Sequence, residues 1–196
     1  TNSLWLYTGT GDYERIGSTN TGTNNLMLGI SDPHYPAYRD VAVATKASDL
    51  TNCKNTTKDT TGAKCPQTPK DVGWYITLDD FQKVTAEPTV SSGLVYFPIY
   101  KPSSSVNKCS LGDAFICGVD DECGTNVSNK LGSFRNKKDS CMYVGQGVLS
   151  RIVVYANKLF ANIAGQSTNA QKKDLVVLDA AAGGTSSYRS SWRQNY

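Results

Sequence analysis

The sequence repeats one unit of short strands, and this repeat limits the possible fold more than any other feature. Residues 86–100 read AEPTVSSGLVYFPIY, and the run DAFICGVDDECG follows after a loop. Residues 149–165 read LSRIVVYANKLFANIAG, and DLVVLDAAAGG follows after a second loop. In both units a short turn, at 92–93 or 156–158, joins the first two strands, and the third strand ends in Val-Asp or Leu-Asp. A recurring unit of antiparallel strands is typical of the blades of a β-propeller.

The remaining strand-like runs fit the same unit. LWLYTGTG at 4–11 and NNLMLGISD at 24–32 match its second and third strands, and DVGWYITL at 71–78 matches its fourth. Helical periodicity is almost absent, and the one candidate helix, at 37–50, is equally compatible with a strand or an irregular turn. A β-sandwich would also account for the strands, although it would not account for the repeat.

We therefore predict an all-β fold: a partial β-propeller of about three four-stranded antiparallel blades, with long disulfide-bearing loops. The blade-like units lie at about 1–80, 81–145 and 146–196, as parts of a single propeller domain. Because the first unit lacks its leading strand, we expect further polypeptide to complete the ring and to cover exposed faces and strand edges. Residues 188–194 are expected to lie against a neighbouring strand.

Six cysteines occur without a CxxC pair, which favours disulfides over a structural zinc site, whose ligands usually come in closely spaced pairs. The only histidine, His34, lies far from any cysteine in the sequence. The surroundings of the cysteines are polar, which argues against buried thiols, so we expect an oxidising, extracytoplasmic compartment. The positions of the loops predict three pairs: Cys53–Cys65, Cys109–Cys141 and Cys117–Cys123.

The net charge of +3 hides an asymmetry between the two halves of the chain. Residues 1–100 carry 8 Lys+Arg against 10 Asp+Glu, and residues 101–196 carry 12 against 7. The basic loop at 130–138 has no interleaved aromatic platform, so solvated charge explains it better than a nucleic-acid footprint. No run of about 18 apolar residues occurs, so we expect no transmembrane segment.

The densest carboxylate cluster is Asp120-Asp121-Glu122. Calcium takes about six to eight oxygen ligands, usually from alternating positions around a glycine turn. Three adjacent side chains on an extended segment point in diverging directions, so this cluster is a weak metal candidate and a solvated turn is the simpler interpretation. A second weak candidate lies in the first loop: Asp12, Glu14 and Asn20.

The sequence offers few groups for catalysis. His34 lies between two prolines in SDPHYPAY, which indicates a rigid turn, and no serine has a GxSxG setting. We therefore predict that the chain is not an enzyme and needs no cofactor. A quinoprotein-like enzyme would require an adjacent cysteine pair and a tryptophan floor beneath the quinone. No Cys-Cys occurs, and the tryptophans fall at strand positions suited to packing between blades: Trp5, Trp74 and Trp192.

A carbohydrate-binding propeller is the other alternative. Tyrosine rings combine an apolar body with a polar edge, which suits stacking on sugars. One or two tyrosines occur on many of the strands, which a packed β core also needs, so both interpretations stay open. The tyrosines that could form such a face are Tyr35, Tyr38, Tyr96, Tyr100, Tyr143, Tyr155 and Tyr188.

Four stretches resemble the PilC/PilY family of type IV pilus tip-associated adhesins. LWLYTGTGDY followed by NLMLGISD is similar to an aromatic strand, a Gly-Thr-Gly turn and a second strand of that family. DVGWYITL followed by KVTAEPTVSSGLVYF is similar to its Gly-Trp-Tyr stretch and Pro-x-Val strand. KCSLGDAFICGVDDECGTN and SYRSSWRQN are similar to its cysteine-bearing insert and chain end. The resemblance covers most of residues 4–193 in scattered short matches.

The resemblance implies the C-terminal part of a seven-bladed, quinoprotein-like propeller behind a von Willebrand factor A-type domain. It implies a non-enzymatic role in pilus biogenesis and surface adhesion, with minor pilins, the N-terminal part of the same protein and a surface or host ligand as partners. It also implies a location at the pilus tip, on the outer membrane surface or in the secreted fraction. The family's calcium loop and its Arg-Gly-Asp motif do not occur in this sequence.

Overall fold

The computed structural model describes residues 4–11, 14–19, 24–32, 35, 46–53, 72–79, 81–104, 110–125, 140–165 and 175–181. These residues form thirteen β-strands, β1 to β13, and one short 3-10 helix, η1, with no α-helix among them. The strands form three separate sheets, and nearly all pairs of strands are antiparallel. The predicted all-β fold class is therefore confirmed.

The first sheet has the strand order β1-β2-β4-β3. Strands β1 (Leu4–Gly9), β2 (Leu26–Asp32) and β4 (Gly73–Thr77) are antiparallel neighbours, as their matches to successive strands of one unit predicted. The two-residue strand β3 (Thr51–Asn52) runs parallel to β4 and was not predicted. The end of the candidate helix at 37–50 forms η1 (Ala47–Asp49), and the first part of that segment lies outside the described residues.

The second sheet is built around β7 (Leu94–Lys101) and β8 (Asp113–Asp120), which pair along their full length. On the other side of β7 lie two short strands, β5 (Lys83–Val84) and β6 (Thr89–Ser91), which act as two halves of one interrupted strand. Strand β9 (Cys141–Gln146) pairs with β8 and forms the far edge.

The third sheet repeats this plan. Strands β10 (Val148–Leu149) and β11 (Val153–Tyr155) are two halves of an interrupted strand that pairs with β12 (Lys158–Ala164), and β13 (Leu175–Asp179) pairs with the other side of β12. Within each interruption one backbone bond to the neighbouring strand persists, from the Thr85 N–H to the Pro98 carbonyl and from the Ser150 N–H to the Asn162 carbonyl. The sequence repeat therefore corresponds to a structural repeat.

Both repeats turn from the interrupted strand into the next strand through two residues with positive φ. These angles are 55° and 74° at Ser92 and Gly93, and 47° and 58° at Ala156 and Asn157. Positive φ at both central residues defines the type I′ turn, whose twist matches that of paired antiparallel strands. The turn predicted at 156–158 included Lys158, whereas in the structure Lys158 is the first residue of β12.

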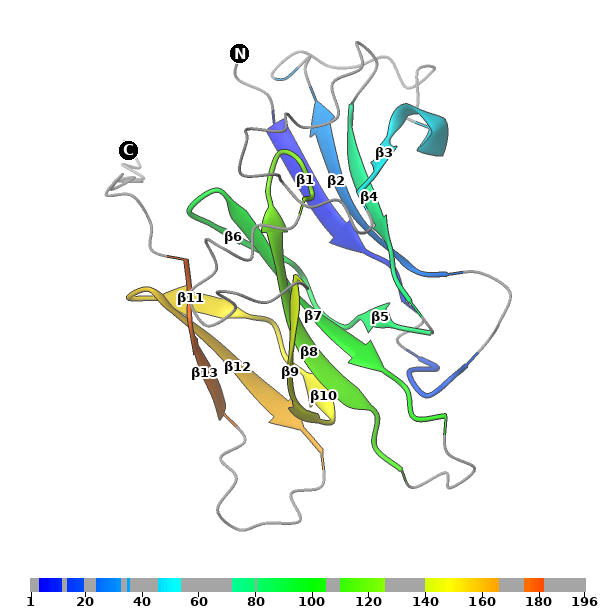
Figure 1. The fold of residues 1–196 in the computed structure, drawn as a ribbon, viewed down its shortest axis with the longest axis vertical. Helices are drawn as coiled ribbons and strands as arrows, with labels where there is room; N and C mark the ends of the chain where they lie inside the picture. The colour runs from blue at the N-terminus through cyan, green and yellow to red at the C-terminus, as the bar shows by residue number, and fades with distance from the viewer. Residues whose placement is uncertain are drawn as a thin grey trace, which may run out of the picture.

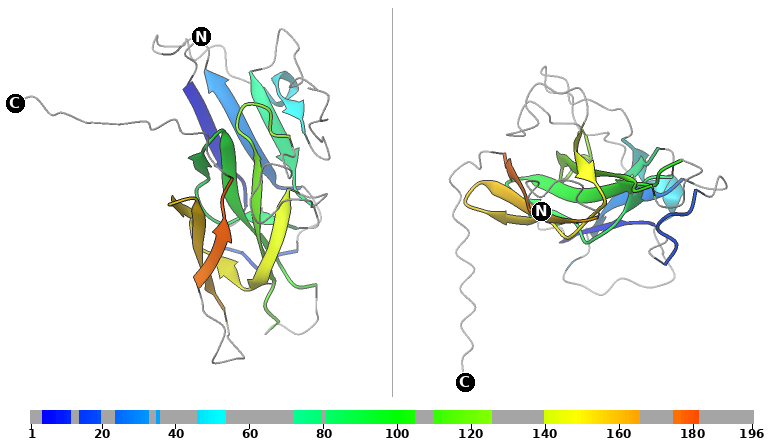
Figure 2. Two further views of the ribbon diagram at one scale, coloured as in Figure 1. Left: turned by 60° about the vertical axis from the view of Figure 1, so that its left-hand side comes forward. Right: turned by 90° about the horizontal axis from the view of Figure 1, so that it is seen from below.

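The second sheet lies between the other two (Figure 1). Figure 2 shows the same order from two further directions. One apolar cluster joins the first and second sheets, and a second cluster joins the second and third sheets. As a result, β7 is buried from Leu94 through Tyr100, with alternate side chains entering the two clusters.

Trp74 fills the junction between the first and second sheets and is almost fully buried. Gly29 and Gly124 leave room for its ring, because a Cβ atom at either position would overlap the indole. Trp5 is half-buried and packs against the same cluster. The prediction that tryptophans pack between blade-like units holds for these two residues, and Trp192 lies outside the described residues.

One disulfide joins Cys117 of β8 to Cys141 of β9. The predicted pairs Cys109–Cys141 and Cys117–Cys123 are therefore wrong. The reason is the strand register, because the antiparallel pairing of β8 with β9 sets these two residues directly opposite each other, with Cα atoms 4.0 Å apart. At a sequence separation of 24, closing the loop stabilises the fold by about 3 kcal/mol in the chain-entropy model.

The other cysteines lie partly beyond what the structure describes. Cys123 is also disulfide-bonded, so its partner is not Cys117. Cys53 is buried, and its Sγ atom lies 3.0 Å from the Cys123 carbonyl oxygen. Cys65 and Cys109 lie outside the described residues, so Cys53–Cys65 stays a prediction.

Peptide mapping without reduction tests the corrected pair. Cleavage before aspartate places Cys117 alone in the peptide 113–119 and separates it from Cys123 and from the peptide that begins at Asp139 and holds Cys141. We expect peptide 113–119 to be linked to the peptide that begins at Asp139. Its recovery with the peptide that begins at Asp121, or as a free thiol, would contradict the register of β8 and β9.

Candidate interaction surface

The third sheet carries an apolar face that points away from the second sheet. Strand register sets Val153, Phe160 and Val177 in one cross-strand row, because Phe160 of β12 is the partner of both other residues. Tyr155 lies two residues after Val153 in β11, and Leu175 lies two residues before Val177 in β13, so both are on the same face. We call these five residues the outer face of the third sheet.

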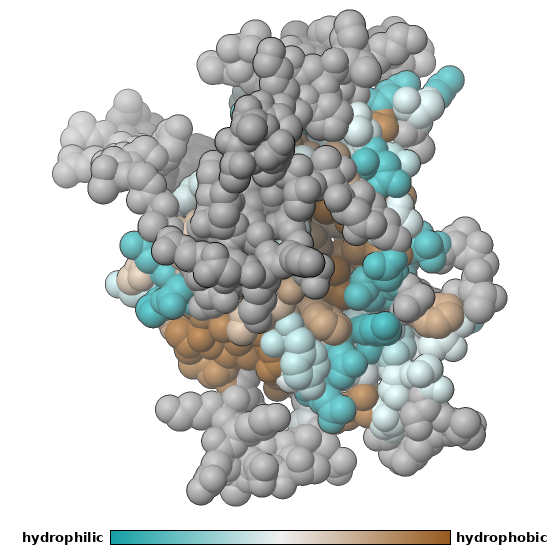
Figure 3. All heavy atoms as spheres, in the orientation of Figure 1, coloured by the Kyte–Doolittle hydropathy of each residue, from teal (hydrophilic) through white to brown (hydrophobic). Residues whose placement is uncertain are grey.

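Four of the five side chains of the outer face are exposed to solvent although most of the face is apolar, and Phe160 between them is partly buried. The exposed fractions are 55% for Val153, 46% for Leu175, 48% for Val177 and 74% for Tyr155. Figure 3 shows hydrophobic residues gathered over β12 and β13. Contiguous exposed apolar side chains on a folded protein usually mark an interaction surface.

The opposite face of the third sheet is also apolar, but it is covered by the second sheet. Leu159 and Ala161 point toward the second sheet and are buried in the cluster that joins the two sheets. Strands of the third sheet are therefore apolar on both sides. Such strands are typical of a sheet that is buried on both faces, and this continuous apolar pattern is the sequence signal that could have identified the outer face.

A polar pair borders the outer face at the end near the type I′ turn. The Lys158 ammonium contacts the Asp179 carboxylate across β12 and β13. Both side chains are about half exposed, so the pair contributes little to stability in water. It marks the polar rim of the surface.

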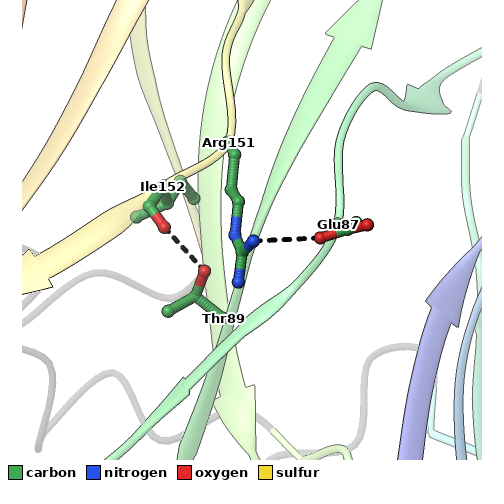
Figure 4. Close-up of polar contacts among 4 residues, drawn as sticks. All are labelled: Glu87, Thr89, Arg151 and Ile152. Carbon is green, nitrogen blue, oxygen red and sulfur yellow. Dashed lines mark hydrogen bonds and ion pairs between the residues drawn. The ribbon is translucent and has the colours of Figure 1, made fainter.

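A row of polar contacts joins the interrupted strands of the second and third sheets. The Thr85 hydroxyl donates to the Leu149 carbonyl at 3.2 Å. The Thr89 hydroxyl donates to the Ile152 carbonyl at 2.6 Å, beside an ion pair of 3.0 Å between Arg151 and Glu87 (Figure 4). The edge strand of the third sheet, formed by β10 and β11 with the interruption between them, therefore presents backbone carbonyls that threonines of the second sheet bind.

These contacts differ in their importance for stability. Thr89 is part-buried, so replacing its hydroxyl leaves the Ile152 carbonyl without this donor. The side chains of Arg151 and Glu87 are 60% and 79% exposed, so water screens their attraction. The threonine contact, rather than the ion pair, aligns the two sheets.

Substitutions at Thr89 and Glu87 test whether the threonine hydrogen bond contributes more to stability than the ion pair. We expect Thr89→Val to lower the free energy of unfolding by about 1 kcal/mol, because the shape is kept and only the hydrogen bond is lost. Glu87→Gln, the matched control, should cost less than about 0.5 kcal/mol. Denaturant unfolding measures both. An equal or larger loss for the control would contradict the assignment.

The acidic turn after β8 is a structural junction between the first two sheets. The backbone carbonyl of Asp121 accepts hydrogen bonds from the Trp74 indole at 2.8 Å and from the Tyr7 hydroxyl at 3.2 Å. The Asp120 carboxylate accepts from the backbone N–H groups of Glu122 at 3.2 Å and Cys123 at 3.0 Å. The carboxylate of Asp120 therefore caps its own turn.

This arrangement does not favour the weak metal candidate Asp120-Asp121-Glu122. Within the described ranges, no group of three or more His, Cys, Asp or Glu side chains converges as metal ligands would. For the second candidate, Glu14 lies on an exposed turn, and Asp12 and Asn20 lie outside the described residues. His34 and the basic loop at 130–138 lie outside them as well.

The junction shifts the ionisation of two side chains. Burial raises the pKa of Asp121, and the nearby Asp120 carboxylate raises it further, while a hydrogen bond from the Glu122 N–H lowers it. Burial also raises the pKa of the Tyr7 hydroxyl, with further contributions from the three carboxylates of the turn. The folded chain therefore disfavours the charge on Asp121.

The raised pKa of Asp121 gives a pH-dependent prediction. A carboxyl group with a higher pKa in the folded than in the unfolded state makes the fold less stable as pH rises through that interval. We expect Asp121→Asn to raise the melting temperature at pH 7, with a gain that shrinks as the pH falls below the pKa of Asp121. The gain should be small, because Asp121 is only partly buried and solvent screens its charge.

Glu14→Gln removes the same charge from an exposed turn and serves as the control for Asp121→Asn. It should leave the melting temperature unchanged at pH 7 and at a pH below the pKa of Asp121. A loss of stability in Asp121→Asn at pH 7, or a gain that does not depend on pH, would contradict the role of burial at this junction.

The proposed tyrosine face for sugars is not assembled as one surface. Tyr96 and Tyr100 are buried, and each hydroxyl accepts a backbone N–H, from Ala181 and Gly112 respectively. Tyr143 and Tyr155 are exposed but belong to different sheets. Of the rest, Tyr35 is exposed, and two lie outside the described residues: Tyr38 and Tyr188.

Comparisons with known proteins support the fold. No family model matches the sequence, and no curated protein matches it significantly. The structure is similar to the crystal structure of the C-terminal domain of PilY1 from Pseudomonas aeruginosa, with 13% sequence identity and a TM-score of 0.54. The likeness covers 92% of this chain and 42% of that chain, so residues 1–196 span less than half of that structure. The partial β-propeller fold class is thus confirmed.

Among the residues that the structure describes, no helix is long and apolar enough to cross a membrane. The disulfide between Cys117 and Cys141 and the likeness to the PilY1 domain are both consistent with a protein that works outside the cytoplasm.

Proposed function

We propose that residues 1–196 belong to a non-enzymatic protein of the type IV pilus, with a role in pilus biogenesis and surface adhesion. The main support is the likeness of nearly the whole chain to the C-terminal domain of PilY1. The scattered sequence similarity to the PilC/PilY family is a second line of support, because it rests on the order of short motifs and not on the fold.

The build of the chain suits a mechanical and binding role outside the cell. Three sheets packed through apolar clusters, with a cross-strand disulfide in the central sheet, form a scaffold that resists unfolding. We propose a location at the pilus tip, on the outer membrane surface or in the secreted fraction. The proposed partners are minor pilins, the N-terminal part of the same protein, and a ligand on a surface or host cell.

The proposal that the chain is not an enzyme rests on its sequence, which has a single histidine and no Cys-Cys pair or GxSxG motif. The proposal that it needs no cofactor has the same basis. A carbohydrate-binding propeller is less well supported, because two of the tyrosines considered for stacking are buried in the core.

Binding and genetic measurements test this function together. We expect the complete natural protein to bind purified minor pilins saturably in biolayer interferometry, and deletion of its gene to reduce surface pili and adherence. His34→Ala should restore both phenotypes as well as the wild type does. Glycan-array binding without pilin binding would favour the carbohydrate alternative, and a turnover lost in His34→Ala would favour an enzyme.

A further inference from the structure

The disulfide partner of Cys123 can be inferred from the positions of the other cysteines. Cys123 is disulfide-bonded, and Cys117 and Cys141 are bonded to each other. Cys53 approaches Cys123 at its backbone, because the Cys53 Sγ atom donates a hydrogen bond to the Cys123 carbonyl at 3.0 Å rather than bonding to the Cys123 sulfur. The described cysteines therefore leave two candidates for the partner: Cys65 and Cys109.

The chain before β8 places Cys109 at the end of the second sheet where β7 ends and β8 begins. Lys101 and Asp113, the last residue of β7 and the first of β8, are strand partners. Beyond them, the hydroxyl groups of Ser103 and Ser110 lie 2.9 Å apart. Cys109 itself lies outside the described residues, but its peptide bond to Ser110 keeps the two Cα atoms about 3.8 Å apart. Cys109 therefore belongs to this end of the sheet.

Cys123 lies at the other end of β8. Its backbone N–H donates to the carboxylate of Asp120, the last residue of β8, at 3.0 Å. A strand rises by about 3.3 Å per residue, so the eight residues of β8 separate its two ends by roughly 23 Å. Two cysteines whose Cα atoms lie more than about 7 Å apart cannot form a disulfide without movement of the backbone. This separation excludes Cys109 as the partner.

We propose that Cys123 is bonded to Cys65. Cys65 lies in the connection from β3 to β4, which are both strands of the first sheet. This connection begins beside Cys123, because Cys53 directly follows β3 and its Sγ atom contacts the Cys123 carbonyl. The Cys53 N–H also donates to the Tyr75 carbonyl of β4 at 2.8 Å. The chain that leads to Cys65 therefore starts at the site of the proposed bond.

Forming this bond oxidises two thiols. Cys65 and Cys123 together lose two electrons and two protons as the S–S bond forms. The disulfide of a thiol–disulfide oxidoreductase in an oxidising compartment accepts them and is reduced to two thiols. The bond between Cys117 and Cys141 requires the same kind of oxidant, so the proposal adds no further co-reactant.

The proposed bond links the first sheet covalently to the turn that follows β8 of the second sheet. At this junction the Asp121 carbonyl already accepts hydrogen bonds from Trp74 and Tyr7. In the part of the chain that the structure describes, the second and third sheets are joined by apolar packing and by hydrogen bonds such as those of Thr85 and Thr89. A disulfide would keep the first junction closed when its hydrogen bonds open.

The proposal and the predicted pair Cys53–Cys65 exclude each other, and the proposal also separates Cys109 from the other cysteines. Cys109 lies too far from Cys53 and Cys123, which meet at the other end of β8. Cys109 therefore forms no disulfide within residues 1–196.

Peptide mapping without reduction tests the proposal on the complete natural protein, after thiols have been alkylated in denaturant. Cleavage before aspartate places the three cysteines in separate peptides: Cys65 in 59–70, Cys109 in 80–112 and Cys123 in 121–138. We expect peptide 59–70 to be linked to peptide 121–138. A link from 121–138 to 80–112, a link from 59–70 to the peptide 49–58 that holds Cys53, or an alkylated Cys123 would overturn the proposal.

Serine substitutions give a second measurement with a matched control. Cys109→Ser should leave the link between peptides 59–70 and 121–138 intact, because Cys109 lies at the other end of β8. Cys65→Ser should release Cys123, so that peptide 121–138 gains one alkyl label. Loss of the link in Cys109→Ser, or a link from 121–138 to 80–112 in Cys65→Ser, would contradict the proposal. The map of the natural protein decides the pairing even if a variant fails to fold.

Discussion

The burial of β7 on both faces holds the described structure together. Its side chains alternate between two apolar clusters, so Val95 and Phe97 pack against the first sheet and Leu94 and Tyr96 against the third. Burying apolar surface contributes about 25 cal/mol per Å². Neither outer sheet contacts the other through these clusters, so each depends on the central sheet for its buried face. The disulfide between Cys117 and Cys141, at the edge of the central sheet, adds to the stability of that sheet.

Polar groups at the junctions determine how the sheets are aligned, which apolar packing alone does not specify. At one junction the Asp121 carbonyl receives both Trp74 and Tyr7. At the other, the interrupted strands expose carbonyls that Thr85 and Thr89 bind. In each case the acceptor is a backbone group that regular strand pairing has left available, and meeting its hydrogen-bonding requirement restricts the neighbouring sheet to one position.

Much of the fold could be predicted from the sequence because it depends on local signals. Apolar runs and turn residues placed the long strands and both type I′ turns, and the repeat predicted how they pair. Strands of two residues, such as β3, β5 and β10, carry too few side chains for such a signal. The pairs predicted for Cys117 and Cys141 were wrong because they were based on how close cysteines lie in the sequence. The observed bond between these two residues depends on the register of β8 and β9, which sequence spacing does not reveal. The sequence did not predict the outer face of the third sheet, because whether an apolar face is exposed depends on whether another sheet covers it.

Native-state hydrogen exchange of the folded protein tests the central role of the second sheet most directly. Amides in the middle of a doubly covered sheet exchange only through global unfolding, whereas edge strands also open locally. We expect the hydrogen-bonded amides of β7 and β8 to exchange most slowly, and those of β1 and β13 to exchange faster. If β7 and β8 exchanged as fast as β1 or β13, the outer sheets would not depend on the central one, and the account would be contradicted.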